Sequence, residues 1–453
     1  MRAYIVIDLG FGDSGKGLLT DFLVRRLHAN VIVRYNGGAQ AGHNVVTSDG
    51  RHHTFSQFGS GTFIPGVRTY LSRHVVIHPT ALLLEGDALQ KLGIYDSFSR
   101  IRISDQSLVI TPFHQAVNRI REILRGANRH GSCGVGVGET VADSRAAPEQ
   151  SILAGDLIHP ETLRKKLTII REYKLEQIAA LCKHIPSGTQ LEKEYRVFER
   201  KDLIDLWISA VSRIGQLNLI AADEVLEDWL HKTENVIFEG AQGVLLDEDV
   251  GFHPYTTWSW CTSENAIQLV NEVMPDSQIS RIGVMRAYAV RHGPGPLPTE
   301  THELDSLISE HNRHGEWQGN VRYGWFDAVM ARYALQATGG VNSVAVTHLD
   351  AVARMQAWKY CQAYKVSRSS EYPFINSDVL DNKLKNIYVD KLMPLDERVK
   401  LTDALFSVAP VIDSCLADEQ SVIGKVESLI DHSVDIVSRG PRAQQVQELG
   451  FVP

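Results

Sequence analysis

The stretch Gly10-Phe11-Gly12-Asp13-Ser14-Gly15-Lys16-Gly17 lies near the start of the chain, between an apolar run at residues 3–9 and an apolar helical pattern at residues 18–27. A strand, a glycine-rich turn and a helix in this order form a phosphate-binding arrangement. Glycines let backbone N–H groups approach an anion, the helix N-terminus adds positive potential, and Lys16 adds a full charge. Because the spacing Gly10-x4-Gly15-Lys16 also matches the P-loop pattern, the turn predicts a site for nucleotide phosphates.

Two residues distinguish this turn from an ordinary P-loop. Gly17 stands where P-loop proteins place the Ser or Thr that binds Mg²⁺, so a metal would need another oxygen ligand. Asp13 lies inside the turn, where a carboxylate repels phosphate unless it binds a metal or moves a proton. The sequence therefore indicates a chemical role for Asp13, with a plain strand–helix turn as the alternative.

Composition narrows the class of protein. The 453 residues are 43% hydrophobic and 22% charged, with a formal net charge of -8, which is ordinary for a globular protein and offers no basic patch to a nucleic-acid polymer. The five cysteines are widely spaced and include no C-x-x-C, which argues against a disulfide framework or a zinc site and favours a reducing cytoplasm. We expect neither a signal peptide nor a membrane span.

Short apolar runs rich in β-formers alternate with helical patterns, which predicts an α/β protein with a large, mostly parallel, buried sheet. The predicted strands lie at residues 3–9, 30–34, 74–78, 235–238, 281–285 and 343–348. Residues 112–126 have helical periodicity. Residues 160–232 are charged and helix-periodic with few Gly or Pro, so we expect a helical insertion within a single domain of residues 1–453; a separate helical domain is the alternative. The stretch 364–400 is predicted to be loop and short elements.

Further motifs follow the turn in a fixed order along the chain. They are Gly37-Gly38-Ala39-Gln40-Ala41-Gly42-His43, Phe238-Glu239-Gly240-Ala241-Gln242-Gly243-Val244-Leu245-Leu246-Asp247, Gly295-Pro296-Leu297-Pro298-Thr299-Glu300 and Gly324-Trp325-Phe326-Asp327-Ala328. Together with the turn they resemble the adenylosuccinate synthetase family, from residue 3 to about 442. The family's turn reads Gly-Asp-Glu-Gly-Lys-Gly where this chain has Gly-Asp-Ser-Gly-Lys-Gly. The resemblance implies the family's fold and a homodimer.

The resemblance also implies a ligase whose partners are small molecules. In the family, GTP phosphorylates the 6-oxygen of inosine monophosphate, and L-aspartate then displaces the 6-phosphate to form adenylosuccinate. Carried over, Asp13 is the general base that removes the proton from N1, and His43 donates to the oxygen between the β- and γ-phosphates. Lys16 and Mg²⁺ hold the transferring phosphoryl group, and Asp13 with the carbonyl of Gly42 binds the metal.

The same resemblance assigns residues to each substrate. The GTP site comprises Gly12, Ser14, Gly15, Lys16, Gly17, His348, Asp350, Ser438, Gly440 and Pro441. A carboxylate at Asp350 can accept from both N1 and N2 of guanine, which adenine cannot match, so we expect GTP, with ATP as the alternative. The acceptor nucleotide and the amino acid are assigned Gln40, Ser132, Cys133, Arg145, Gln242, Thr257, His292, Thr299 and Arg322.

Departures from the family cluster at the acceptor and the amine. The segment before Gly324 is about three residues shorter than the family's Thr-Thr-Gly-Arg-x-Arg loop and keeps one arginine, Arg322. His292 replaces an apolar residue. Ala147 stands where the family has an arginine that reaches the partner subunit's nucleotide, and Arg145 lies two residues away. These changes leave open a paralogue that joins a different amine or nucleotide, and a GTP-binding regulatory homologue without ligase activity.

Overall fold

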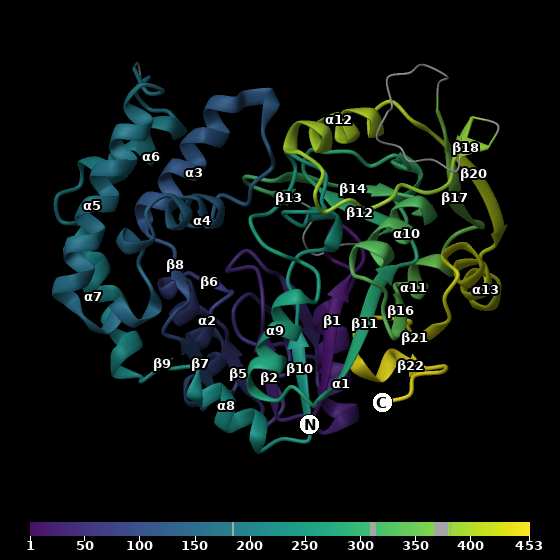
Figure 1. Cartoon of the computed structure of the whole chain (residues 1–453), viewed down its shortest axis with the longest axis horizontal. Helices are drawn as coiled ribbons and strands as arrows, with labels where there is room; N and C mark the ends of the chain where they lie inside the picture. Colours follow the sequence, from purple (N-terminus) through teal and green to yellow (C-terminus); the bar gives the residue numbers. More distant parts are fainter. Residues whose placement is uncertain (184, 309–313, 367–378, 381) are drawn as a thin grey trace.

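A large central sheet crosses the molecule (Figure 1). The computed structural model describes the chain except for residues 184, 309–313, 367–378 and 381. Within that part, ten strands form the sheet in the order β22-β21-β16-β11-β1-β10-β2-β5-β7-β9. Neighbouring strands pair in parallel except β21 and β22, which pair antiparallel. This confirms the predicted α/β class with a mostly parallel sheet.

The sheet strands are short apart from the central β11. Five of them, β1, β2, β10, β11 and β16, coincide with predicted apolar runs. The strands of this sheet are β1 (Arg2–Asp8), β2 (Val31–Arg34), β5 (Arg68–Leu71), β7 (Ile101–Ser104), β9 (Ile220–Ala221), β10 (Asn235–Glu239), β11 (Gln278–Arg286), β16 (Ser343–Thr347), β21 (Val434–Ser438) and β22 (Val446–Glu448). The smaller sheets contain β3 (His43–Val46), β4 (His52–Phe55), β6 (Val76–Ile77), β8 (Leu108–Val109), β12 (Ala289–His292), β13 (His314–Gly315), β14 (Gly319–Gly324), β15 (Phe326–Asp327), β17 (Ala357–Lys365), β18 (Val379–Leu380), β19 (Lys383–Leu384) and β20 (Ala409–Leu416).

The register of the central strands places the loops that follow them at one edge of the sheet. Val6 of β1 is opposite Glu239 of β10, and Asp8 is opposite Val284 of β11. These strands are buried on both faces, which suits their near-continuous runs of β-branched and aromatic residues. Because parallel strands end at a common edge, the segments after β1, β10, β11 and β16 meet there, where open α/β sheets bind ligands.

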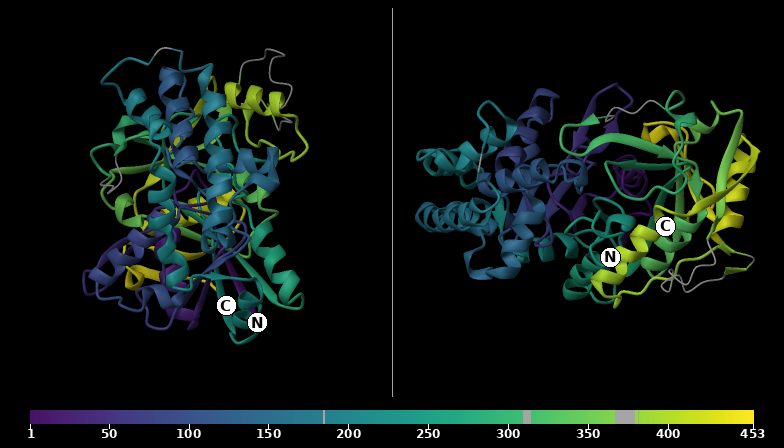
Figure 2. Two further views of the ribbon diagram at one scale, coloured as in Figure 1. Left: turned by 90° about the vertical axis from the view of Figure 1, so that its left-hand side faces the viewer. Right: turned by 90° about the horizontal axis from the view of Figure 1, so that it is seen from above.

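Helices cover both faces of the sheet and form one end of the molecule. The α-helices are α1 (Lys16–Leu27), α2 (Pro79–Lys91), α3 (Pro112–Arg125), α4 (Val137–Ala146), α5 (Pro160–Ala179), α6 (Gln190–Glu199), α7 (Leu203–Gln216), α8 (Glu224–His231), α9 (Glu264–Val273), α10 (Ala328–Ala337), α11 (Leu349–Val352), α12 (Leu395–Leu405) and α13 (Glu419–Ile430). In Figure 2 the blue and teal helices lie at one end of the molecule and the green and yellow elements at the other. None of the helices in the described residues is long and apolar enough to cross a membrane.

The predicted helical stretch 160–232 is helical over most of its length, but one part of the prediction is wrong. Helices α5, α6 and α7 bury apolar residues such as Leu163, Trp207 and Val211 in a core shared with α2 and α3. Ile220 and Ala221 instead form strand β9, which pairs with β7 and completes one edge of the sheet. The chain returns to the sheet here through Asn218, which has a positive φ of 52°.

Two other boundaries differ from the predictions. Within residues 74–78, only Val76–Ile77 form a strand, and that strand pairs with β8 outside the central sheet. In the stretch 364–400, residues 367–378 and 381 lie outside the described residues, and residues 395–405 form α12 rather than a short element. Helix α12 buries Leu401 and Leu405, which explains how a charged stretch sustains a helix.

Candidate active site

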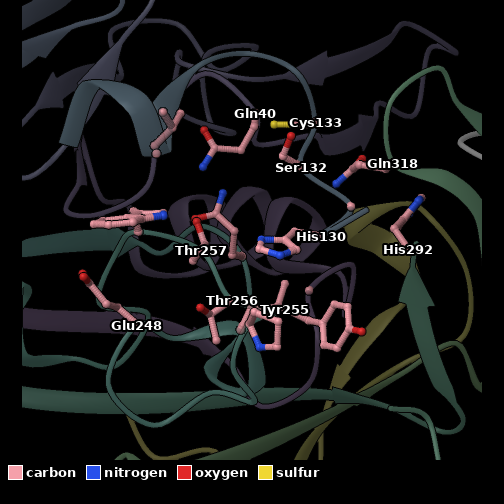
Figure 3. Close-up of a pocket in the computed structure, with 18 of the residues that line it drawn as sticks. Gln40, His130, Ser132, Cys133, Glu248, Tyr255, Thr256, Thr257, His292 and Gln318 are labelled. Atoms are coloured by element: carbon pink, nitrogen blue, oxygen red, sulfur yellow. The ribbon is translucent and has the colours of Figure 1, made fainter. Parts of the chain in front are cut away.

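A cavity of about 660 Å³ lies beyond the carboxyl ends of the central strands. Figure 3 shows Gln40, Ser132 and Cys133 along one wall and Tyr255, Thr256 and Thr257 along the opposite wall. The cavity is also lined by the loop after β1 and by the end of β12. Twelve of the predicted site residues line it: Gly12, Asp13, Lys16, Gln40, Gly42, His43, Ser132, Cys133, Arg145, Gln242, Thr257 and His292.

The phosphate turn is held in a conformation that depends on its glycines and on one strained residue. Gly12, Asp13 and Gly15 have φ values of 96°, 58° and 94°, and a positive φ at an aspartate is uncommon. Helix α1 begins directly after the turn. A Cβ on Gly17 would lie 2.9 Å from the Cβ of His43 and 3.0 Å from its carbonyl carbon. The residue is therefore glycine because α1 packs against the His43 backbone, which leaves no room for a hydroxyl-bearing side chain.

Asp13 faces the cavity with one carboxylate oxygen already engaged. The Nε2 of His292 lies 2.7 Å from its Oδ2, and Arg286 donates to its backbone carbonyl. Burial raises the pKa of Asp13, but the hydrogen bond and charge of His292, together with Arg286 and Lys16, lower it well below the ordinary value. Asp13 is therefore ionised at neutral pH, and its Oδ1 remains to accept a proton or a metal bond.

His43 is oriented by a carboxylate that the sequence prediction did not include. Its Nδ1 lies 2.6 Å from Oε1 of Glu239, the last residue of β10, and the backbone N–H of Ser60 donates to Oε2 at 3.0 Å. Burial raises the pKa of Glu239, but the charges of Arg34 and His43 lower it to about 2. Burial lowers the pKa of His43 and Glu239 opposes this shift. Because Nδ1 is engaged, Nε2 is the ring nitrogen that can meet a ligand.

Replacing this carboxylate is expected to reduce turnover more than stability. We expect Glu239→Gln to lower kcat by about 10²-fold, because His43 loses the carboxylate that orients its ring and favours its protonated form. The measurement is acceptor-dependent phosphate release. Glu85→Gln is the matched control, since Glu85 is also buried and accepts from the backbone N–H groups of residues 56–58 outside the cavity. Equal kcat values for the two variants would contradict a positioning role for Glu239.

The oxygen atoms at this end of the cavity suit a magnesium ion that arrives with a nucleotide. The Asp13 carboxylate and the Gly42 segment both line the cavity, and carboxylate and carbonyl oxygens are the ligands that Mg²⁺ prefers. The described residues contain no group of three or more His, Cys, Asp or Glu side chains that could hold a metal ion. Mg²⁺ usually takes one or two protein oxygens and completes its shell with water and phosphate oxygens.

The opposite end of the cavity carries paired charges and an aromatic ring. Arg145 donates through Nη2 to Oε2 of Glu248 at 2.8 Å, and its guanidinium lies 5.4 Å from the ring centroid of Trp258. A Cβ on Gly138 would lie 2.8 Å from the same ring. Burial raises the pKa of the Cys133 thiol to about 11, so this residue offers no thiolate at neutral pH. Arg145 thus lies on the wall of its own chain's cavity.

The segment expected to bind the amine has an unexpected packing. Arg322 donates to the carbonyls of Gly293 and Gly295 at 2.9 and 2.7 Å and to Oε2 of Glu300 at 2.7 Å. It does not belong to the cavity lining in the described structure, and neither does Thr299, whose hydroxyl donates to the carbonyl of Trp325. The guanidinium therefore braces the loop of residues 293–300.

Trp317 joins this segment to the acceptor turn. A Cβ on Gly134 would lie 2.6 Å from the Trp317 ring, and the Arg119 guanidinium lies 5.3 Å from the centroid of that ring. Arg119 also donates through Nε to the carbonyl of Gly134 at 2.9 Å. Gln318, the next residue, lines the cavity (Figure 3). The shortened segment therefore packs directly on the turn that precedes α4.

The residues assigned to guanine lie at the ends of β16 and β21, outside the cavity. Thr347 donates its hydroxyl to the carbonyl of Ser14 at 2.8 Å, which ties the end of β16 to the phosphate turn. His348 follows with a positive φ of 63°, and burial lowers its pKa well below the ordinary value. Asp350 lies in α11, 3.8 Å from Arg354. The other predicted residues outside the cavity lining are Ser14, Gly15, Gly17, Ser438, Gly440 and Pro441.

Comparison with known proteins finds the same similarity along nearly the whole chain. The family model described as adenylosuccinate synthetase matches residues 5–447. Adenylosuccinate synthetase from Synechocystis sp. is 35% identical over 373 residues, which cover 80% of this chain and 78% of that protein. The fully ligated adenylosuccinate synthetase from Plasmodium falciparum has a TM-score of 0.74 at 19% identity, covering 98% of this chain and 99% of that one. Succinoaminodeoxyadenylate synthetase of cyanophage S-2L, bound to dGMP and dATP, has a TM-score of 0.58 at 18% identity and covers 99% and 95%.

Proposed function

Because this chain belongs to the adenylosuccinate synthetase family, we propose that it joins inosine monophosphate to L-aspartate at the expense of GTP, forming adenylosuccinate. The observation that carries the proposal is the meeting of an ionised Asp13, a carboxylate-oriented His43 and Lys16 in one cavity. These three groups supply a base, a donor to a leaving oxygen and a cation. Phosphorylation of a purine oxygen requires all three groups. The phosphorylation is itself needed because that oxygen is a poor leaving group until it carries a phosphate.

The reaction divides into two displacements. Asp13 Oδ1 takes the proton from N1 of the purine, which makes the 6-oxygen nucleophilic. The 6-oxygen attacks the γ-phosphorus, and the bond from that phosphorus to the β–γ bridging oxygen breaks while His43, as the imidazolium with its Nδ1–H on Glu239, donates its Nε2–H to the departing oxygen. The amine nitrogen of aspartate then attacks C6, the C6–O bond breaks, and the 6-phosphate leaves as inorganic phosphate.

We extend the proposal to the metal and to the three substrates. Asp13 and the Gly42 carbonyl would hold a Mg²⁺ ion, which would supply positive charge to the nucleotide phosphates. The turn residues and Ser438 to Pro441 hold GTP, with Asp350 and His348 at the base. Gln40, Ser132, Cys133, Gln242 and Thr257 surround inosine monophosphate. His292 fixes Asp13, and Arg322 and Thr299 shape the loop that receives aspartate. We propose that the enzyme works in the cytoplasm as a homodimer of single-domain subunits with a helical insertion at about 160–232.

The direct test is an assay of the full-length protein with inosine monophosphate, L-aspartate and Mg²⁺, with either GTP or ATP. We expect phosphate release and the ultraviolet absorbance change of adenylosuccinate formation, both larger with GTP. Phosphate release that requires inosine monophosphate but not aspartate would show that the protein catalyses only the first displacement. Tight GTP binding without acceptor-dependent hydrolysis would contradict the proposal and favour a regulatory homologue.

Arg145 provides a test of the acceptor's phosphate. We expect Arg145→Ala to raise the KM for inosine monophosphate by about 10- to 100-fold, because one hydrogen bond to a charged group contributes about 1.5–3 kcal/mol. Turnover of inosine, which lacks the phosphate, should not change. Arg200→Ala, which removes an exposed arginine paired with Asp202, is the control. An equal loss with nucleotide and nucleoside would exclude phosphate recognition by Arg145.

A further inference from the structure

Asp8, the last residue of β1, devotes its carboxylate entirely to the phosphate turn. It is 1% exposed. Its Oδ1 accepts from the backbone N–H of Gly10 at 2.9 Å and from the Ser14 hydroxyl at 2.8 Å. Its Oδ2 accepts from the backbone N–H of Ser14 at 2.9 Å and from Nζ of Lys16 at 2.7 Å. These four bonds match the accepting capacity of a carboxylate, so Asp8 fixes both the path of the turn and the position of the lysine ammonium.

The pairing also changes the charge that a nucleotide meets. Lys16 is only 4% exposed, and a buried ammonium needs a compensating partner. Asp8 provides it, so the one lysine of the turn is already neutralised before any phosphate binds.

Ser14, one of the donors to Asp8, departs from the family's turn. Where the resemblance places a glutamate in the turn, this chain has Ser14, and the hydroxyl of Ser14 donates to Asp8. The carboxylate is thus on the strand beneath the turn rather than on the turn itself. Ser14 is buried, so its side chain and that of Asp8 occupy the inner face of the turn, away from the cavity lining.

We infer that Asp8 is a positioning residue that holds the Lys16 ammonium for phosphoryl transfer and compensates its charge before a nucleotide binds. A lysine ammonium has three N–H donors. One remains on Asp8 when a nucleotide binds, and the other two are then directed toward the phosphate oxygens. The catalytic half of this inference rests on the proposed function, whereas the binding half does not.

The experiment compares Asp8→Asn with the wild-type protein in two assays. The first measures binding of a fluorescent GTP analogue with EDTA and with Mg²⁺. We expect the variant to bind about tenfold more tightly than the wild type in EDTA, because its lysine charge is no longer compensated. The second measures acceptor-dependent phosphate release with Mg²⁺. We expect kcat of the variant to fall by about 30-fold with the KM for GTP within about threefold.

A matched control separates this role from the loss of any buried carboxylate. Asp435→Asn removes a buried carboxylate of β21 that accepts from the backbone N–H of Val344 at 3.0 Å, and it should match the wild type in both assays. Unchanged EDTA binding or unchanged kcat in Asp8→Asn overturns the inference. Should that variant not fold, Ser14→Ala, which removes the hydroxyl that donates to Oδ1 of Asp8, takes its place: a lowered kcat supports the inference and a kcat equal to that of the wild type overturns it. A wild type that binds but has no acceptor-dependent turnover refutes the proposed function and leaves the binding result standing.

Discussion

Asp13→Asn is expected to reduce acceptor-dependent phosphate release by at least about 10³-fold while the protein still binds GTP. The amide keeps the size of the carboxylate and can still accept from His292, so the turn should retain its conformation. It cannot take the N1 proton, however, and the 6-oxygen then stays a poor nucleophile. The loss should therefore be in kcat.

The measurement is initial phosphate release at saturating GTP and inosine monophosphate, with GTP binding followed separately. Asp49→Asn is the control, since Asp49 lies between β3 and β4, outside the cavity, and pairs with Arg51. A variant at residue 13 that kept more than a tenth of wild-type kcat would show that another group takes the proton.

Lys174→Met is expected to have the largest effect on stability, lowering the free energy of unfolding by about 3–5 kcal/mol. Lys174 is 1% exposed in α5, and its Nζ donates to Glu139 at 2.9 Å and to Asp143 at 2.6 Å, both in α4. Removing the ammonium leaves these two carboxylates close together and poorly solvated, with Arg121 and His114 as their charged partners among the described residues. The measurement is urea denaturation at pH 7 followed by circular dichroism.

The pH dependence gives this prediction its second test. Burial raises the pKa of Asp143, but His114 and Lys174 lower it below the ordinary value overall. A carboxyl whose folded pKa is depressed stabilises the protein above its unfolded pKa and loses that contribution as pH falls. The stability gap between wild type and Lys174→Met should therefore narrow between pH 7 and about pH 4. Lys232→Met, which removes an exposed lysine paired with Asp228, should change stability by less than about 0.5 kcal/mol. A gap that is independent of pH would mean that lost packing, not charge, explains the effect.

The sequence predicted the sheet and the phosphate turn because both depend on local pattern. Apolar runs with β-branched residues mark strands that are buried on both faces, and the turn's glycines and lysine are contiguous. Strand β9 (Ile220–Ala221) was not predicted because two residues between helical stretches carry no periodicity. This strand depends on its pairing with β7. Helix α12 was missed because its buried face is narrow and its surface is charged.

The candidate site likewise contains residues that the sequence could predict and residues that it could not. Residues that share a motif, such as Gly42 and His43, could be predicted to lie with Asp13 in one place. The carboxylates that contact Lys16 and His43, which are Asp8 and Glu239 respectively, could not be assigned from the sequence. Both stand at the end of a strand that enters the site, but their roles depend on distances that only the fold sets. Arg322 was assigned to the site from the sequence, but the fold gives its side chain other contacts. Its guanidinium was expected to be available to a carboxylate, yet it contacts two carbonyls and Glu300.

The contact between Trp317 and Gly134 has a consequence for how this enzyme could change its substrate. The indole occupies the space that any side chain on Gly134 would need, so the acceptor turn and the amine segment cannot be exchanged independently. Grafting a longer, arginine-rich segment in place of residues 316–320 would remove the indole and uncover the turn. A change of the amine specificity would therefore require a change of the nucleotide side at the same time, so the two specificities are coupled.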